Sequence, residues 1–167
     1  PDHFRSQLPL MDEVLQTLDI TQLREEGFEA DDIIATLTRN GTAAGWDVLI
    51  VTGDRDAFQL IEKAVKVVYT RRGISDIVLA DEGYVEEKYG IRPDQYVEYA
   101  ALRGDTSDNL PGVPGVGEKT ASRLIAEHGD LDNLFLSVTD LTPKLKENLA
   151  AHREQVFLNR ELMRLVD

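Results

Sequence analysis

Residues 104–120 read GDTSDNLPGVPGVGEKT, and this stretch organises the interpretation of the whole chain. It begins with two carboxylates, Asp105 and Asp108, and continues into turns rich in glycine and proline before a helix that opens at Glu118. Carboxylates hold divalent cations, whereas glycine-rich turns before a helix present backbone N–H groups to phosphate. The stretch therefore predicts a cation site joined to a grip on a nucleic-acid backbone.

The composition predicts one domain-sized unit with a substantial core. The chain has 167 residues, 42% of them hydrophobic, and no apolar run long enough to span a bilayer, so no membrane partner is expected. It has no cysteine, which excludes disulfides and thiolate metal sites and fits a reducing cytoplasm. The net charge of −13 has two explanations: a solvated surface, or carboxylates gathered around cations that reverse the local field. Composition does not choose between them.

The pattern of apolar residues predicts an α/β half first. We expect an amphipathic helix over residues 1–18, a loop or edge strand over 19–28, and a helix from about residue 29 that turns Ile33, Ile34 and Leu37 inward. Asn40-Gly41 predicts a kink or an end to that helix. The apolar run Val48–Val51, preceded by Trp46, predicts a strand buried on both faces.

The rest of the chain predicts a hairpin and then helices. We expect a short helix after residue 56, a strand over 65–69 paired with one over 77–79, and helices over 81–89, 93–103, 118–128 and throughout the tail from residue 130. Gly90 and Gly129 are expected to end helices, and Thr142-Pro143 to begin one. The predicted division is an α/β core over 1–103 and a helical part over 104–167, packed on it without a linker.

Seven carboxylates lie at the ends of predicted elements, in three clusters: Glu29, Asp31 and Asp32; Asp54 and Asp56; Asp105 and Asp108. Each cluster has a simpler explanation. Acids in a first helical turn cap free N–H groups. Capping is the favoured interpretation of the first cluster when it is taken by itself, and for the second cluster capping and a ligand site are equally favoured. The third cluster could be a solvated turn.

The combination of the three clusters is more informative than any one of them. If they converged without cations, each pair of charges near 5 Å would repel by roughly 3 kcal/mol at an effective dielectric of about 20. Convergence therefore predicts cations, and oxygen ligands without His or Cys predict Mg²⁺ or Mn²⁺. Such a site suits phosphoryl chemistry with two metal ions.

The turns over Gly112–Gly117 give a more specific signal. Glycines permit close backbone approach, the following helix N-terminus attracts phosphate, and Lys119 and Arg123 add positive charge. The pattern resembles the hairpin of helix–hairpin–helix proteins, which hold the DNA backbone without reading bases. A purely structural turn needs fewer glycines and is less favoured, and a P-loop is excluded by the spacing.

Three ordered motifs together resemble the 5′-nuclease family, in the branch of the 5′→3′ exonuclease domain of bacterial DNA polymerase I, with phage 5′-exonucleases and flap endonucleases as relatives. They are residues 27–34 (GFEADDII), 52–56 (TGDRD) and 104–121 (GDTSDNLPGVPGVGEKTA). The resemblance covers nearly the whole chain. It implies an α/β, PIN-like fold with a mostly parallel central sheet flanked by helices, followed by a helical part that carries a helix–three-turn–helix motif.

The resemblance also implies a metal-dependent nuclease that cuts branched or nicked duplex DNA and leaves a 5′-phosphate. It implies a monomer in the bacterial cytoplasm, with a fused C-terminal polymerase domain as a candidate partner. By position in the motifs, Glu29 and Asp31 match first-metal residues, and Asp54, Asp56 and Asp108 match second-metal ligands. Asp32 and Asp105 match supporting carboxylates. The DNA and K⁺ contacts would fall on Gly112, Val113, Gly115, Val116, Gly117, Lys119, Thr120 and Arg123.

The family pattern begins with a central strand that bears an Asp-Gly-Asn-type motif, followed by a basic arch. Both would precede Pro1, so the resemblance implies that they are absent from this chain. We expect them in residues before Pro1, because losing a central strand would expose its neighbours. This chain alone is then expected to cut a flap far more slowly than an N-terminally extended one.

Two other functions remain open at this point. The first is a structure-specific DNA-binding module without catalysis, since the hairpin is complete and the metal set is not. Loss of Mg²⁺-dependent cleavage on changing Asp54 or Asp108 separates it from a nuclease. The second is an aspartate-based phosphotransferase at Asp54 and Asp56, which predicts a covalent aspartyl-phosphate and leaves the hairpin unexplained.

Overall fold

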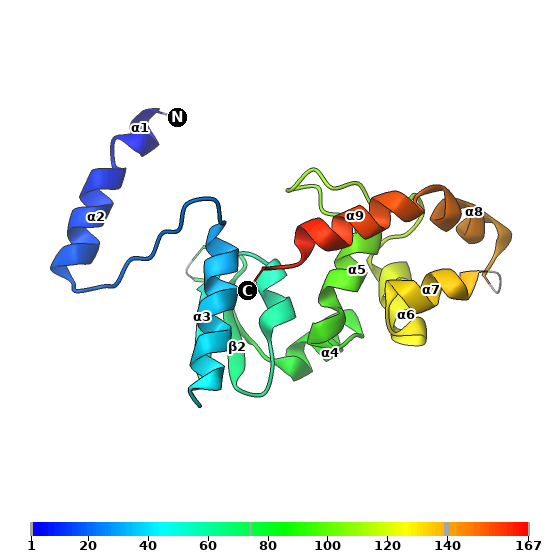
Figure 1. Ribbon diagram of the computed structural model, residues 1–167, viewed down its shortest axis with the longest axis horizontal. Coiled ribbons are helices and arrows are strands. Elements are labelled where there is room, and N and C mark those ends of the chain that lie inside the picture. The colour runs from blue at the N-terminus through cyan, green and yellow to red at the C-terminus, as the bar shows by residue number, and fades with distance from the viewer. Residues whose placement is uncertain (1, 74, 139–140, 167) are drawn as a thin grey trace.

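The computed structural model describes residues 2–73, 75–138 and 141–166 (Figure 1). Pro1 lies outside this part of the chain. In chain order the elements are α1 (Asp2–Arg5), α2 (Leu8–Thr17), α3 (Ala30–Ala43), β1 (Val48–Thr52), η1 (Asp56–Leu60), β2 (Val65–Thr70), β3 (Ile77–Ala80), α4 (Glu82–Tyr89), η2 (Pro93–Gln95), α5 (Tyr96–Arg103), α6 (Glu118–His128), α7 (Leu131–Leu136), α8 (Pro143–Ala151) and α9 (Arg153–Met163).

The first two helices stand apart from the rest of the molecule (Figure 1). The expected helix over residues 1–18 is interrupted at Ser6-Gln7, and α2 starts with Pro9 in its first turn, where a missing N–H is tolerated. The pattern is amphipathic as predicted, but no residue of α2 is buried, and Leu8 and Met11 are exposed. Residues 20–25 form a loop without a strand, which was one of the two predicted outcomes.

Helix α3 differs from the prediction in two respects. It continues through Asn40-Gly41 to Ala43 without ending there. The glycine allows close packing, because a Cβ at Gly41 would lie 3.0 Å from Cγ2 of Val48. The expected burial of Leu37 is also wrong: its side chain is 47% exposed, and the buried positions of α3 are Ala35, Thr38 and Gly41.

The sheet has three strands in the order β1-β2-β3. Strands β1 and β2 are parallel, with Val48 opposite Val65, and β2 and β3 form the predicted antiparallel hairpin. The expected burial of β1 on both faces is wrong, because β1 is an edge strand and only Ile50 is buried. Leu49 and Val51 are 59% and 67% exposed, since alternate side chains of a strand point to opposite faces of the sheet.

An aromatic cluster packs directly behind the end of β1. The ring of Phe58 in η1 is fully buried and lies 5.2–6.1 Å, centroid to centroid, from those of Tyr69, Tyr84, Tyr89 and Tyr96. Aromatic pairs of this kind stabilise by about 0.5–1.5 kcal/mol each beyond the area they bury. The cluster therefore fixes the turn between β1 and η1 against β2, α4 and α5.

Helix α5 is the central element of the second half and packs against both α6 and α9. The buried amide of Asn159 in α9 donates to the carbonyls of Ala101 (3.1 Å) and Pro111 (2.9 Å). This ties α9 to α5 and to the segment that follows α5. The helix predicted over 118–128 is confirmed as α6, and it ends at Gly129, whose φ is +89°. The tail is helical as predicted in α7, α8 and α9, and residues 139, 140 and 167 lie outside the described part.

The end of the chain returns to the first half, where it lies beside α3 (Figure 1). The side chain of Gln59 donates to the carbonyl of Met163 (3.0 Å) and accepts from the N–H of Leu165 (3.1 Å). The N–H of Val166 donates to Oδ1 of Asp32 (2.9 Å). Among the described residues, no helix is both long and apolar enough to cross a membrane.

Candidate active site

Three segments meet at the C-terminal end of β1: the first turn of α3, the turn after β1, and the loop after α5. The meeting is visible in the electrostatics of Asp31, whose pKa is raised by partial burial and then by the charges of Asp54, Glu29, Asp32 and Asp108. Asp54 and Asp108, which lie 23 and 77 positions after Asp31 in the chain, are therefore close enough in space to act on its charge. The structure brings together members of all three clusters that the sequence singled out.

The turn after β1 positions Asp54. Its N–H donates to Oγ1 of Thr52 (3.0 Å), and its own Oδ1 accepts from the N–H of Asp56 (2.9 Å), which opens η1. One carboxylate oxygen thus accepts from the first N–H of η1, although the N-cap residue itself is Arg55 and, among the described residues, η1 has no side-chain cap. The side chain is nevertheless exposed and faces a cavity. Asp54 therefore both accepts from the first N–H of η1 and faces the cavity.

Asp56 carries a strongly perturbed carboxyl group. Its pKa is raised to about 7, first by burial and then by the charges of Asp54, Asp105, Asp108 and Asp31, in that order. In the part of the chain that the structure describes, Asp56 has no ion pair with a lysine or arginine. A carboxyl group in this setting either holds a proton or requires a cation.

Asp105 has the opposite character. Its Oδ2 accepts from Nη2 of Arg103 (3.1 Å), and its Oδ1 accepts from the N–H (2.8 Å) and the hydroxyl of Ser107. Partial burial acts to raise the pKa of Asp105, but the hydrogen bonds from Ser107 and the charge of Arg103 outweigh burial and lower it. Asp105 is therefore satisfied within the protein and shapes the loop around it.

The loop itself is closed by backbone contacts. Asp105 and Leu110 exchange two N–H to carbonyl bonds of 2.8 Å each. At its base Gly104 has a φ of +77°, and a Cβ there would lie 2.2 Å from the backbone nitrogen of Gly112. Asp108 projects from the loop as an exposed carboxylate, and its pKa is raised by partial burial and then by Asp105 and Asp54.

The remaining two predicted residues lie at the start of α3. Oδ2 of Asp32 accepts from the N–H of Glu29 (3.2 Å), and its Oδ1 accepts from Val166. Asp32 thus serves as a helix cap and as an anchor for the C-terminal segment. Glu29 is exposed, and its charge acts on Asp31.

These carboxylates meet part of what a metal site requires. In residues 2–73, 75–138 and 141–166, no three His, Asp or Glu side chains lie close enough together to hold one ion among them. The donors are all oxygens, and they repel one another. Mg²⁺ keeps several waters and is usually held by one or two carboxylates together with substrate phosphates. The donor set therefore fits Mg²⁺ or Mn²⁺ better than an ion that needs a complete protein cage.

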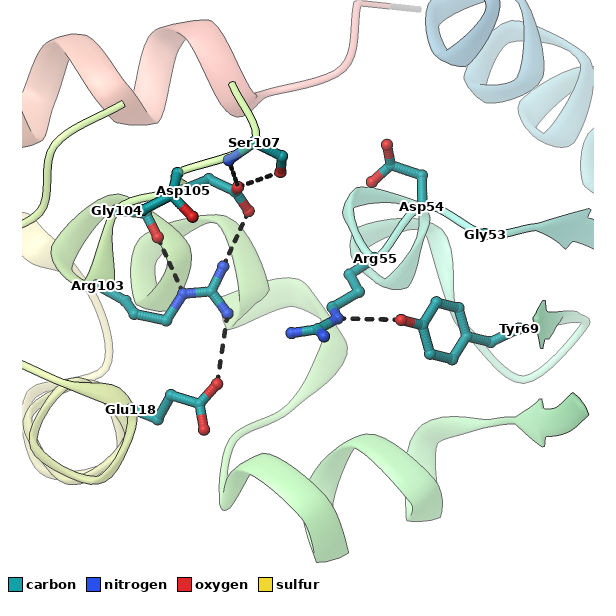
Figure 2. Close-up of a pocket in the computed structure, with 10 residues that line it drawn as sticks. Gly53, Asp54, Arg55, Tyr69, Arg103, Gly104, Asp105, Ser107 and Glu118 are labelled. Atoms are coloured by element: carbon teal, nitrogen blue, oxygen red, sulfur yellow. Dashed lines mark hydrogen bonds and ion pairs between the residues drawn. The ribbon is translucent and has the colours of Figure 1, made fainter. Parts of the chain in front are cut away.

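The acidic segments border a cavity of about 640 Å³ that has two walls (Figure 2). Gly53, Asp54, Arg55 and Tyr69 form one wall, and Arg103, Gly104, Asp105, Ser107 and Glu118 form the other. Sequence reasoning missed both arginines. Arg55 donates to the hydroxyl of Tyr69 (3.1 Å), and Nη1 of Arg103 approaches Glu118 at 3.8 Å. The signal was present in the sequence, because each arginine lies within two residues of a predicted acid.

The hairpin follows directly from this wall. Val113 and Val116 are buried, and the N–H of Val113 donates to the carbonyl of Leu102 (3.0 Å), so these two side chains pack inward and anchor the turns. Gly115, with a φ of +80°, and Gly117 are exposed. Gly112 has no room for a side chain, because a Cβ would lie 1.9 Å from the Arg103 carbonyl.

The predicted DNA-facing side chains of α6 differ in their surroundings. Lys119 is exposed, and no carboxylate of the described residues is paired with it. Arg123 is paired with Glu127 at 3.0 Å, one helical turn further on. Thr120 is half-buried, and its N–H donates to the Gly117 carbonyl (3.0 Å). Lys119 is therefore the most available of the three for a phosphate.

Two family models match adjacent parts of the chain. Residues 1–90 match the N-terminal resolvase-like domain of the 5′-3′ exonuclease, and residues 91–167 match the C-terminal SAM fold of the 5′-3′ exonuclease. Among curated proteins, DNA polymerase I of Mycobacterium tuberculosis is 51% identical over 166 residues, which are 99% of this chain and 18% of that protein. The thermostable DNA polymerase I of Thermus thermophilus is 43% identical over 162 residues, 97% of this chain and 19% of that protein. The chain thus spans less than a fifth of their length.

Solved structures give the same fold. The flap endonuclease of bacteriophage T5, in a pseudo-enzyme-product complex with DNA and metal ions, superposes with a TM-score of 0.83 over 98% of this chain and 59% of that one, at 23% sequence identity. The architecture described above, a small sheet with helices followed by a helical part, is therefore a known fold, as the sequence predicted.

Proposed function

The chain belongs to the 5′-3′ exonuclease family, and from this membership we propose that its acidic cavity hydrolyses phosphodiester bonds at 5′ ends and flaps of DNA with the help of divalent cations. One observation carries the proposal: carboxylates from three separate stretches act on one another beside a hairpin that presents backbone groups. The homologous polymerases add a setting, a nuclease part of a longer bacterial DNA polymerase that acts in the cytoplasm.

The electrostatics supply the physical reason for cations. Asp31, Asp56 and Asp108 each have a raised pKa, and the causes include neighbouring carboxylates in every case. A divalent cation would offset this repulsion and stabilise the ionised forms. We assign its binding to Asp31, Asp54, Asp56 and Asp108, with Glu29 at the edge. When bound, a pair of Mg²⁺ or Mn²⁺ ions would activate a water and stabilise the leaving oxygen.

The chain's own residues would position the DNA around that site. The exposed residues Gly115, Gly117 and Lys119 suit contact with a duplex phosphate, because they lie just before and in the first turn of α6. Arg103 contacts both Asp105 and Glu118, so it joins the acidic loop to the first turn of α6. The hairpin would therefore fix the distance between the held phosphate and the cut bond. The contacts are to backbone, so binding is expected to be independent of sequence.

The direct test is cleavage of a labelled 5′-flap DNA in Mg²⁺ and in EDTA. We expect cleavage that requires Mg²⁺ and falls at least about a hundredfold in Asp54→Asn, since charge stabilisation at a reacting phosphate contributes on that scale. Asp47→Asn is the matched control, because Asp47 is an exposed acid at the opposite end of β1. Cleavage that persists in EDTA, or an unchanged rate in Asp54→Asn, would reject the proposal.

A second function has one observation in its favour. Because no three acidic or histidine side chains of the described residues are close enough to hold a single ion, a DNA-binding module without catalysis is the alternative. The same assay separates the two. Flap binding that survives Asp54→Asn, with no cleavage at any Mg²⁺ concentration, would favour the binding module.

A further inference from the structure

A group of cations lies beside the acidic cavity, although the chain as a whole is strongly acidic. A neighbouring cavity of about 410 Å³ is lined by Arg55, Tyr69, Arg71, Arg72, Asp76 and Lys88. Four of these six residues are cationic, in a chain whose net charge is −13. Arg55 lies in the turn before η1, Arg71 and Arg72 lie in the turn between β2 and β3, and Lys88 lies in α4. Three segments therefore contribute to one surface. We call Arg55, Arg71, Arg72 and Lys88 the basic groove.

Most of these charges have no acidic partner. Among the described residues, no carboxylate lies within 4.0 Å of the cationic groups of Arg55, Arg72 or Lys88. Arg71 is the exception, with Asp76 at 2.6 Å. The chain contains 31 acidic residues, so partners were available in the sequence. Cations that line one cavity without carboxylate partners among the described residues are available to an anion from outside the chain.

Aromatic rings hold two of the cations in place without neutralising them. Nε of Arg55 donates to the hydroxyl of Tyr69 (3.1 Å). Nζ of Lys88 donates to the hydroxyl of Tyr84 (2.9 Å) and lies 5.2 Å from the ring centroids of both Tyr84 and Tyr89. Cation–π contacts orient an ammonium group but leave its charge available to an anion. The groove is thus charged and positioned before any ligand arrives.

Arg55 connects this groove to the site already described. It also lines the acidic cavity with Asp54, and its guanidinium group is hydrogen-bonded to the hydroxyl of Tyr69 on the same wall (Figure 2). A third cavity contains Arg55 and Lys88 together with Lys119 of α6. The basic groove therefore runs from the acidic carboxylates toward the β2–β3 turn and adjoins the first turn of the hairpin helix.

We propose that the basic groove binds the sugar–phosphate backbone of a nucleic-acid strand next to the acidic cavity. A single phosphate ion would need cations that converge on one point, whereas these cations are spread over three elements and two adjoining cavities. A polymer with one charge per nucleotide matches such a row. The inference rests on the proposed function, because it takes the acidic cavity as the place of cleavage. The strand is either a single-stranded 5′ flap or an arm of the duplex.

The test compares two double variants of the full chain. Arg72→Gln with Lys88→Gln removes two charges from the groove. Lys63→Gln with Lys66→Gln removes two exposed charges from the opposite end of the sheet, at the start of the central strand β2. Binding is measured by fluorescence anisotropy in Ca²⁺ over a range of salt concentrations, for a blunt duplex and for the same duplex with a 5′ overhang. Melting curves of the variants establish that both are folded.

We expect the groove variant to lose salt dependence. The slope of log K against log salt concentration should become shallower by about 1.4 for two contacts to a single strand, or by about 1.8 for two contacts to a duplex. A loss seen only with the overhang assigns the groove to the single strand, and a loss with both DNAs assigns it to the duplex. The control variant should keep the slope of the unmodified chain.

Two results would overturn the inference: an unchanged slope in the groove variant with both DNAs, or an equal loss in the control variant. Arg72→Gln alone serves as a second variant that leaves the Lys88 contacts with tyrosine intact, and it should lose about half as much slope. Cleavage in Mg²⁺ is followed in parallel. If Asp54→Asn cuts like the unmodified chain, the proposed function fails whatever the slopes are; if only the slopes fail, the groove alone is rejected.

Discussion

The turn after β1 and the loop after α5 both border the same cavity, yet they treat their carboxylates in opposite ways. In the turn, Asp56 lacks a cationic partner among the described residues, and its pKa is raised to about 7, first by burial. In the loop, Asp105 is held by Arg103 and Ser107, and its pKa is lowered. The carboxyl group of Asp56 is thus available to a bound cation, whereas the carboxylate of Asp105 holds the loop in place through its hydrogen bonds. A cluster of identical residue types can therefore contain both a site and its scaffold.

The largest expected effect would break the scaffold side of this comparison. Gly104→Ala places a Cβ 2.2 Å from the backbone of Gly112 at a φ of +77°. We expect it to lower the free energy of unfolding by about 3 kcal/mol, because steric overlap and left-handed strain add. Urea denaturation measures this.

Gly117→Ala provides the matched comparison for that change. Gly117 belongs to the same stretch, but its φ is −92° and a Cβ there meets nothing within 4 Å. It should change stability by less than about 0.5 kcal/mol. If the two variants were equally stable, the close approach of Gly104 to Gly112 would have no energetic importance.

A smaller effect is expected from a change at Asp56, the carboxyl group that lacks a cationic partner among the described residues. Asp56→Asn should stabilise the metal-free protein at pH 8, because the folded-state pKa of about 7 lies above the ordinary value of 3.8. Such a carboxyl contributes its full stability below the unfolded pKa and loses it as pH rises through the folded pKa. About three units correspond to about 4 kcal/mol at 1.36 kcal/mol per unit, which solvent screening reduces to about 2 kcal/mol.

The measurement is thermal unfolding in EDTA between pH 4 and pH 8. The advantage of Asp56→Asn over the unmodified chain should be absent near pH 4, grow with pH and level off above pH 7. The same variant should lose Mg²⁺-dependent stabilisation. A constant difference across this range would mean that the carboxyl is not perturbed in the folded protein.

The smallest effect has the opposite sign. Asp105→Asn removes an acceptor from Arg103 and Ser107 and should destabilise the protein at pH 7 by about 1 kcal/mol. Because the pKa of Asp105 is lowered, its contribution is present above the unfolded value of 3.8 and is lost as pH falls through the folded value. The deficit of Asp105→Asn should therefore shrink below about pH 4. A deficit that grew on acidification would contradict the assigned role.

The sequence was most informative where local chemistry decides the outcome. Gly90 and Gly129 end α4 and α6 as predicted, because each has a positive φ that glycine adopts readily. It was least informative where the packing of another element decides whether a residue is buried. The run Val48–Val51 looks the same whether one or both faces are covered, so the run by itself does not reveal that β1 is an exposed edge strand. Gly41 likewise suggested a helix end and instead permits packing on Val48.

The candidate site divides along the same line. The carboxylates could be predicted from their positions at the ends of elements. Their electrostatic interaction with one another could be identified only from the folded structure. The resemblance separated Asp31, as a metal residue, from Asp32, as a supporting carboxylate. The structure adds that Asp32 caps α3 and accepts from Val166, whereas the pKa of Asp31 is raised by partial burial and then by its neighbouring carboxylates. The proximity of Arg55 and Arg103 to predicted acids was visible in the sequence, but their partners depend on the fold. Arg55 donates to Tyr69, and Arg103 pairs with both Asp105 and Glu118.

The clasp between the C-terminal segment and α3 has a mechanical consequence. The N–H of Val166 is bonded to Asp32, and Gln59 is bonded on both sides of Arg164, to Met163 and Leu165. Tension applied at residue 166 would therefore be transmitted to the first turn of α3 and to η1, the two segments that carry Asp31 and Asp56. A load on this segment would reach both acidic segments through the hydrogen bonds of Asp32 and Gln59.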